Sequence, residues 1–89
     1  MKAVITVVGP DRVGIIAEVC TQLAQEHISV VEISQTIMEK TFTMIMLVEW
    51  TPGAPDFETV QKSLSALSET MGVSIRIQRQ DIFNAMHTI

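Results

Sequence analysis

The chain has 89 residues, of which 47% are hydrophobic, and a formal net charge of -4; this length and composition indicate one domain and leave no room for a second. Six Lys and Arg against ten Asp and Glu argue against nucleic acid as a partner, because a phosphate-binding surface needs clustered cations. The single cysteine, Cys20, excludes an internal disulfide and paired-cysteine metal sites, and it suits the reducing cytoplasm. A core this small gains from a partner subunit, so we expect self-association.

Residues 2–8 are rich in Val, Ile and Thr and are followed by Gly9-Pro10. This pattern predicts a strand that a turn ends at Gly9-Pro10. Both faces of the strand are apolar, which is typical of a central strand covered on both sides. The run is too short for the apolar region of a signal peptide or for a membrane-spanning helix, so we expect neither export nor a membrane partner.

A helix is expected next, from about residue 12 to about residue 26, with Asp11 as its N-cap. The residues predicted to face the core repeat at helical spacing, and they are Ile16, Val19, Cys20 and Leu23.

Residues 28–50 are mainly β-branched and apolar, and the polar Glu39-Lys40-Thr41 interrupts them once. We therefore predict two antiparallel strands joined by a tight turn. In the second strand, one face is predicted to hold Phe42, Met44, Met46, Val48 and Trp50. The opposite face would then hold Ile45 and Leu47, which also need cover.

The second half of the chain repeats this order. Residues 52–55 read as a loop, Asp56 can cap a helix that ends at Gly72, and residues 73–78 alternate as a half-buried strand. The apolar stripe predicted for this helix consists of Phe57, Val60, Leu64, Leu67 and Met71. Residues 81–89 carry apolar side chains at near-helical spacing, so we expect a single domain over residues 1–89, with a core at 1–80 and a short docked helix as a C-terminal extension at 81–89.

The element order is strand, helix, strand, strand, helix, strand. Two right-handed βαβ-type halves predict an α+β, ferredoxin-like βαββαβ fold, in which a four-stranded antiparallel sheet carries both helices on one face. The other face of that sheet stays open, and its apolar residues indicate an interface. The C-terminal extension, a second subunit, or both could cover it.

Few residues suit catalysis or metal binding. His27 and His87 have no His, Cys or carboxylate three or four residues away, so we expect no metal site. Cys20 falls on the predicted apolar stripe without a neighbouring base and is interpreted as a small core residue rather than a nucleophile. We therefore expect neither catalytic residues nor a cofactor.

The segment that is most informative about function is residues 9–16, between the first strand and the first helix. It is not a phosphate-binding P-loop, because Ile15-Ile16 stand where that motif needs Lys followed by Ser or Thr, and a dinucleotide fingerprint fails for want of its middle glycine. What remains is a helix N-terminus with unpaired amides and a glycine, Gly14, which suit a small carboxylate. The alternative is that Gly14 only lets the helix pack tightly on the sheet, and the loop alone does not decide between the two.

The segment Asp11-Arg12-Val13-Gly14-Ile15-Ile16, together with residues 28–36 after the helix, resembles the ACT domain, in particular its small stand-alone bacterial members. The resemblance covers the whole chain, including the tail. It implies a non-enzymatic regulatory module that senses an amino acid or similar small metabolite where two domains associate side by side through their sheets. We therefore expect a homodimer, an amino acid or small carboxylate as ligand, and a regulated enzyme as a further partner.

The resemblance also implies a ligand site. Amides around Val13, Gly14 and Ile15 would meet the ligand's carboxylate, with Asp11 nearby and Ile16 lining the pocket. Second-strand residues across the interface would close the site, with Ser34 and Gln35 as candidates. Ser29 stands at the family's usual asparagine position, and Val13 replaces the usual proline, so the loop and its contacts with a ligand depart from the family pattern.

Three other functions fit the element order. A constitutive protein-protein interaction module would keep the fold without a ligand. An enzyme of the acylphosphatase type needs a phosphate-cradling loop with an Arg and a distant Asn, for which Arg12 and Asn84 are the only nominal candidates. An RNA-recognition domain stacks bases on aromatic residues of its central strands, and the first strand here has none.

Overall fold

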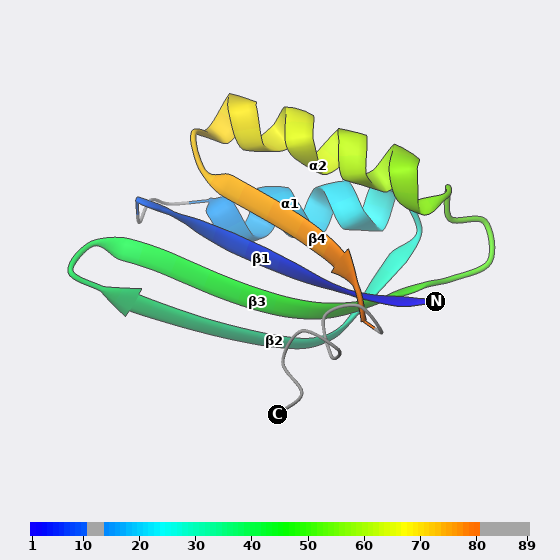
Figure 1. The fold of residues 1–89 in the computed structure, drawn as a ribbon, viewed down its shortest axis with the longest axis horizontal. Coiled ribbons are helices and arrows are strands. Elements are labelled where there is room, and N and C mark those ends of the chain that lie inside the picture. Colours follow the sequence, from blue (N-terminus) through cyan, green and yellow to red (C-terminus); the bar gives the residue numbers. More distant parts are fainter. Residues whose placement is uncertain (11–13, 81–89) are drawn as a thin grey trace.

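The computed structural model describes residues 1–10 and 14–80, which form a four-stranded antiparallel sheet with two helices on one face (Figure 1). The elements in chain order are β1 (Lys2–Pro10), α1 (Ile15–Gln25), β2 (Ile28–Met38), β3 (Thr41–Trp50), α2 (Phe57–Met71) and β4 (Ser74–Arg79). The strands lie in the order β2-β3-β1-β4. This confirms the predicted ferredoxin-like fold and makes β2 and β4 the edge strands. The predicted helix within residues 81–89 lies outside the described residues.

The end of β1 differs from the prediction. The strand continues through Gly9, opposite Phe42, and Pro10, opposite Thr41, so the predicted turn at Gly9-Pro10 is wrong. Pro10 is tolerated because β4 pairs with β1 only as far as Val8, which leaves Pro10 with a single neighbouring strand, as for proline at a sheet edge. Gly9 is needed because a Cβ at this position would lie 2.6 Å from Cγ1 of Val73.

Helix α1 begins later than predicted. Its N-cap residue is Gly14, three positions after the predicted cap Asp11, which itself lies outside the described residues. The buried face of α1 consists of Ile15, Val19 and Leu23, while Ile16 and Cys20 are only partly buried against the core. Val19 and Leu23 are therefore buried as predicted, whereas Ile15 takes the buried position that was predicted for Ile16.

The core lies between the two helices and the covered face of the sheet. Burial of β3 alternates as predicted, with Met44, Met46 and Val48 fully buried and Ile45 exposed. The same face of β1 contributes Ala3, Ile5 and Val7. Helix α2 adds the buried Val60, Leu64 and Met71, with Phe57 and Leu67 partly buried beside them. Its predicted stripe is thus confirmed, and Asp56 is its N-cap, accepting a hydrogen bond from the Thr59 N–H at 2.9 Å.

Polar contacts fix the helices relative to each other and to β3. The Glu26 carboxylate accepts hydrogen bonds from Gln22 Nε2 at 3.1 Å and from Ser63 Oγ at 3.0 Å, which links α1 to α2. At the end of β3, Trp50 Nε1 donates to the Pro55 carbonyl at 2.7 Å, and the indole stacks on Phe57 with ring centroids 6.0 Å apart. These contacts hold the start of α2 against the sheet.

The edge strand β2 is the least covered element. A two-residue turn with positive φ at Glu39 and Lys40 joins it to β3, as twisted hairpins require. A bulge at Val31 interrupts the pairing between Val30 and Glu32. After the buried Ile28, all residues of β2 are exposed. Helix α1 therefore covers only part of β2. The outer edge of β2 carries apolar side chains that no described residue covers.

Candidate functional site

Backbone amides lie at the start of α1. Among the described residues, the first hydrogen bond of the helix runs from the Glu18 N–H to the Gly14 carbonyl at 2.9 Å, so the amides of Ile15, Ile16 and Ala17 come before the first helical hydrogen bond in this part of the chain. Gly14 has no side chain that could cap them. Amides at a helix N-terminus carry a partial positive charge, which favours a carboxylate or another anion at this position.

The structure excludes one of the two explanations that the sequence left open for Gly14. Its φ is 93°, in the left-handed region that favours glycine. A Cβ added to Gly14 would meet nothing within 4 Å, so close packing of helix on sheet does not explain the glycine. The residue is needed for its backbone conformation, and the space beside it is open.

A hollow of about 450 Å³ lies beside this helix start. We call it the loop hollow, and its lining residues are Gly14, Ile15, Ile16, Ala17, Gln35, Ile37 and Phe42. Gln35 lies opposite Met44 and Ile37 opposite Phe42 in the register, so both belong to the helix side of β2. The walls are mostly apolar and include residues of the helix start, and Gln35 has the single polar side chain among the described lining residues.

Four of the site residues predicted from the sequence meet in this hollow. They are Gly14, Ile15, Ile16 and Gln35. Asp11 and Val13 lie outside the described residues, so their predicted roles stay predictions.

The two predicted serines lie elsewhere. Ser34 pairs with Ile45 and Ser29 with Glu49, both of which belong to the sheet face turned away from the helices. Successive side chains of a strand point to opposite faces, so within one chain Ser34 does not face the same hollow as Gln35. Ser34 instead lines a second hollow on the open face. Whether either serine contacts a ligand stays a prediction.

Sequence reasoning missed three residues of the loop hollow, which are Ala17, Ile37 and Phe42. Phe42 was assigned to a face of β3 and Ile37 to β2, but the contact between the hairpin end and the start of α1 depends on the sheet register. The spacing of Ile37 two positions after Gln35 could have signalled a shared face.

The described lining residues of the loop hollow offer groups that suit binding. They include no acidic, basic or nucleophilic side chain, and they can donate hydrogen bonds and bury apolar surface. Within residues 1–10 and 14–80, no group of three or more His, Cys, Asp or Glu could hold a metal ion. In the same part of the chain, no helix is long and apolar enough to cross a membrane.

Comparison with known proteins places this arrangement in a family. The ACT domain family matches residues 2–78. A UPF0237 protein from Bifidobacterium longum is 49% identical over 88 residues, which cover 99% of this chain and 98% of that protein. The fold is similar to an ACT domain protein from Streptococcus pneumoniae, with a TM-score of 0.82 and 38% identity over 93% of each chain.

A more distant structure is a regulatory subunit. The ligand-free regulatory subunit of aspartate kinase from Thermus thermophilus is similar with a TM-score of 0.67 and 26% identity, over 86% of this chain and 50% of that one. ACT domains are commonly regulatory modules that bind amino acids. On the match over residues 2–78 and the near-full-length relatives, this chain belongs to the ACT domain family.

Proposed function

We propose that this protein is a non-enzymatic sensor that binds an amino acid or a similar small carboxylate in the loop hollow, as a homodimer in the cytoplasm. The observation that carries the proposal is the composition of that hollow, which combines helix-start amides with apolar walls. Family membership supports it, because ACT domains commonly bind amino acids for regulation.

Each part of an amino acid has a matching group in the loop hollow. The carboxylate would accept hydrogen bonds from the amides of Ile15 and Ile16, where the helix dipole adds attraction. The Gln35 side chain offers both a carbonyl oxygen and an amide donor, so it can accept a hydrogen bond from the ligand's amino group. Ile37 and Phe42 supply apolar surface for the ligand's side chain, as small-molecule sites usually do.

The proposed dimer uses the edge of β2. Ile33 is 47% exposed, Ile37 57% and Met38 70%, and an edge strand of this kind pairs readily with another strand. Two copies of β2 placed side by side would form one continuous sheet. Because Gln35 and Ile37 belong both to this edge and to the loop hollow, a second subunit would lie next to the bound ligand and help to enclose it.

A sensor of this type needs a protein that responds to it. We propose a regulated enzyme as that partner. The similarity to the regulatory subunit of aspartate kinase supports this class of partner.

A thermal-unfolding screen against the common amino acids tests the ligand. A ligand that binds only the folded state at about 100 times its Kd stabilises it by about 2.7 kcal/mol. At about 4 to 8 °C per kcal/mol for a domain of this size, the melting temperature should rise by about 10 to 20 °C. A folded protein that shows no shift with any amino acid contradicts the proposal and favours a constitutive interaction module of the same fold.

A pair of variants at Gly14 tests the site. Gly14→Ala and Gly14→Asp both place a side chain at a φ of 93°, so they share the backbone strain, and a Cβ has open space there. Only Gly14→Asp adds a negative charge beside the amides. Titration calorimetry with a ligand found in the screen should give at least about tenfold weaker binding for Gly14→Asp than for Gly14→Ala, or about 1.4 kcal/mol. Equal affinities would show that the carboxylate binds elsewhere.

A further inference from the structure

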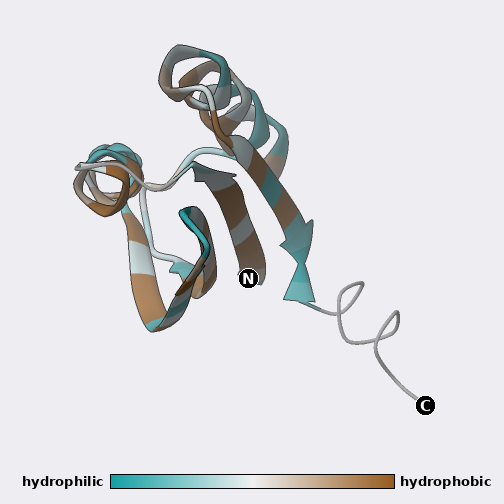
Figure 2. Cartoon of the chain, turned by 90° about the vertical axis from the view of Figure 1, so that its left-hand side faces the viewer, coloured by the Kyte–Doolittle hydropathy of each residue, from teal (hydrophilic) through white to brown (hydrophobic). Residues whose placement is uncertain are grey.

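Strand β2 forms one edge of the described sheet and has β3 as its neighbour on one side only (Figure 1). Both helices lie over one face of this sheet (Figure 2), and we call the other face the open face. The large apolar residues Ile33, Ile37 and Met38 are exposed on β2. The outer side of such a strand offers backbone hydrogen-bonding groups to another strand.

Two irregularities limit the part of β2 that can pair regularly. The bulge at Val31 shifts the register just before Glu32. At the other end, the turn that follows Met38 has positive φ at Glu39 and Lys40, so these two residues are not extended. Residues 32–38 lie between the bulge and the turn without a further register shift. We call them the regular stretch.

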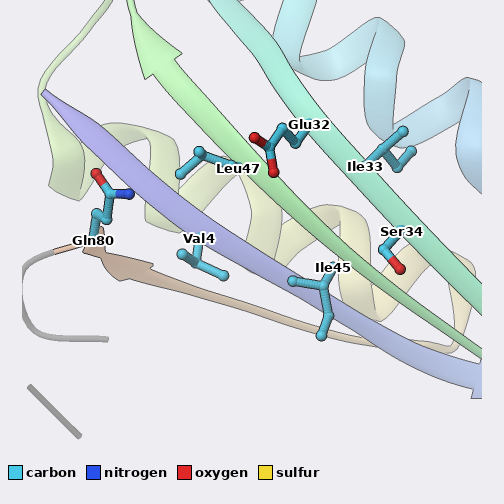
Figure 3. Close-up of a pocket in the computed structure, with 7 residues that line it drawn as sticks. All are labelled: Val4, Glu32, Ile33, Ser34, Ile45, Leu47 and Gln80. Carbon is cyan, nitrogen blue, oxygen red and sulfur yellow. The ribbon is translucent and has the colours of Figure 1, made fainter. Parts of the chain in front are cut away.

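Side chains of the regular stretch alternate between the two faces of the sheet. The odd-numbered residues lie opposite buried residues of β3 and belong to the helix side, whereas the even-numbered residues belong to the open face. Figure 3 shows Glu32, Ile33 and Ser34 in succession along β2. When two copies of β2 pair antiparallel in one continuous sheet with all helices on the same side, odd-numbered residues must lie opposite odd-numbered ones. The two-fold axis therefore passes through a residue and not between two residues.

The midpoint of the regular stretch is Gln35, and an axis there pairs the whole stretch with its copy. An axis at Ser34 or at Thr36 leaves two residues at one end of the stretch without a regular partner. Of these three positions, only Gln35 places Ile33 opposite the partner's Ile37, twice by symmetry. Cross-strand pairs of β-branched apolar residues stabilise a sheet.

The charges agree with this register. Glu32 is the only charged residue of β2, and an axis at Gln35 places it opposite the partner's Met38. The partner's Lys40 follows two residues later and is exposed, at the diagonal position that long side chains reach on a neighbouring strand. Two copies thus offer two contacts between Glu32 and Lys40, while their two Glu32 carboxylates lie at opposite ends of the paired stretch.

We infer that two copies of this chain pair antiparallel through residues 32–38 of β2, with the two-fold axis at Gln35. The partner's Ile33 then lies opposite Ile37, which lines the loop hollow, so each site gains apolar surface from the other copy. The inference rests on the homodimer of the proposed function and specifies its register.

A scan of single cysteines in the full-length chain tests the register. With Cys20→Ser removing the native thiol, three variants carry Ser34→Cys, Gln35→Cys or Thr36→Cys. Residues directly opposite each other have Cα atoms about 4.5 to 5.5 Å apart, which suits a disulfide, so Gln35→Cys should link two copies on oxidation. For Ser34→Cys and Thr36→Cys, the two thiols belong to diagonal neighbours about 7 to 8 Å apart. These variants should link at least about tenfold more slowly, because a disulfide over that distance needs backbone movement.

Sedimentation of the reduced variants separates the register from the dimer itself. A dimer that links fastest at Ser34→Cys or Thr36→Cys would overturn the register and keep the pairing of β2. A dimer that links at none of the three positions would place the interface elsewhere and overturn the inference. A chain that sediments as a monomer would contradict the proposed homodimer as well, whereas the amino-acid screen tests ligand binding independently.

Charge reversal gives a second measurement without cysteines. Glu32→Lys should weaken the dimer about tenfold, because two attractive contacts with the partner's Lys40 become repulsive. Adding Lys40→Glu should restore the dissociation constant to within about threefold of the wild-type value. The control Glu69→Lys, on the exposed side of α2, changes the net charge equally and should leave the dimer unchanged. A double variant that dimerises no more tightly than Glu32→Lys alone would contradict the contact and the register that creates it.

Discussion

Replacing Gly9 with alanine tests the close contact between β1 and the residue that precedes β4. An added Cβ would lie 2.6 Å from Cγ1, 2.9 Å from Cβ and 3.2 Å from the Cα of Val73, whereas carbon atoms in ordinary contact are about 3.5 to 4.0 Å apart. A change of rotamer could move Cγ1 but not Cβ or Cα, so the backbone must shift by several tenths of an ångström. Overpacking of this kind costs about 1 to 3 kcal/mol, and the lower entropy of the unfolded alanine chain offsets about 0.4 to 1 kcal/mol of that.

The net loss in the free energy of unfolding should therefore be about 1 to 2 kcal/mol. For a domain of this length, that corresponds to a melting temperature lower by about 4 to 16 °C. Urea and thermal unfolding followed by circular dichroism, at one fixed protein concentration, measure both quantities.

A double-mutant cycle separates this contact from a general effect of alanine. Val73→Ala removes Cγ1, the atom nearest to the added methyl group, so Gly9→Ala should cost less in the Val73→Ala background than in the wild type. Coupling energies between contacting residues are about 0.5 to 3 kcal/mol. Part of the cost should remain in that background, because alanine keeps the Cβ and Cα of residue 73. A Gly9→Ala variant as stable as the wild type would refute the argument that Val73 requires glycine at this position.

Three further predictions concern other elements. Hydrogen bonds from the Thr59 side chain and, to a smaller extent, from the Thr59 N–H lower the pKa of Asp56 below its ordinary value of 3.8. The wild type should therefore be more stable than Asp56→Ala above about pH 4, and this difference should disappear as the pH falls through the lowered pKa. Thermal unfolding of both proteins between pH 2 and 7 measures the difference. Leu64 is 1% exposed, so Leu64→Ala should cost about 2 to 5 kcal/mol in urea unfolding, clearly more than Leu67→Ala at the partly buried position beside it; equal costs would contradict the assigned core. Val31 is 46% exposed on the β2 edge. The substitution Val31→Lys should therefore convert the proposed dimer into a folded monomer, as measured by sedimentation. A dimer of unchanged affinity would place the interface elsewhere.

Much of the fold could be predicted from local patterns. The helical spacing of Val60 and Leu64 and the cap at Asp56 predicted α2, and the structure confirms both. The polar break at Glu39-Lys40 predicted the hairpin turn, which the structure places there with positive φ at both residues. These features depend on neighbours only a few residues apart in the chain, so a single sequence contains the information that specifies them.

The start of α1 was harder to predict. Asp11 is a chemically good cap, but the helix begins at Ile15 after a left-handed Gly14. Sequence reasoning nevertheless selected the loop that borders the loop hollow, because a glycine at a helix start without phosphate-binding residues already indicates the chemistry of backbone amides.

The sequence by itself thus determined the element order, the buried face of α2 and the loop that carries the candidate site, since each follows from the short-range pattern of the chain. Only the tertiary structure decided which strand residues join that loop. Gln35 faces the loop hollow and Ser34 the open face because pairing with β3 sets the register of β2, and a shift by one residue would exchange them. The same holds for Gly9, whose need for a hydrogen atom in place of a side chain comes from Val73, more than sixty residues away in the chain and in contact with it only after the sheet has formed.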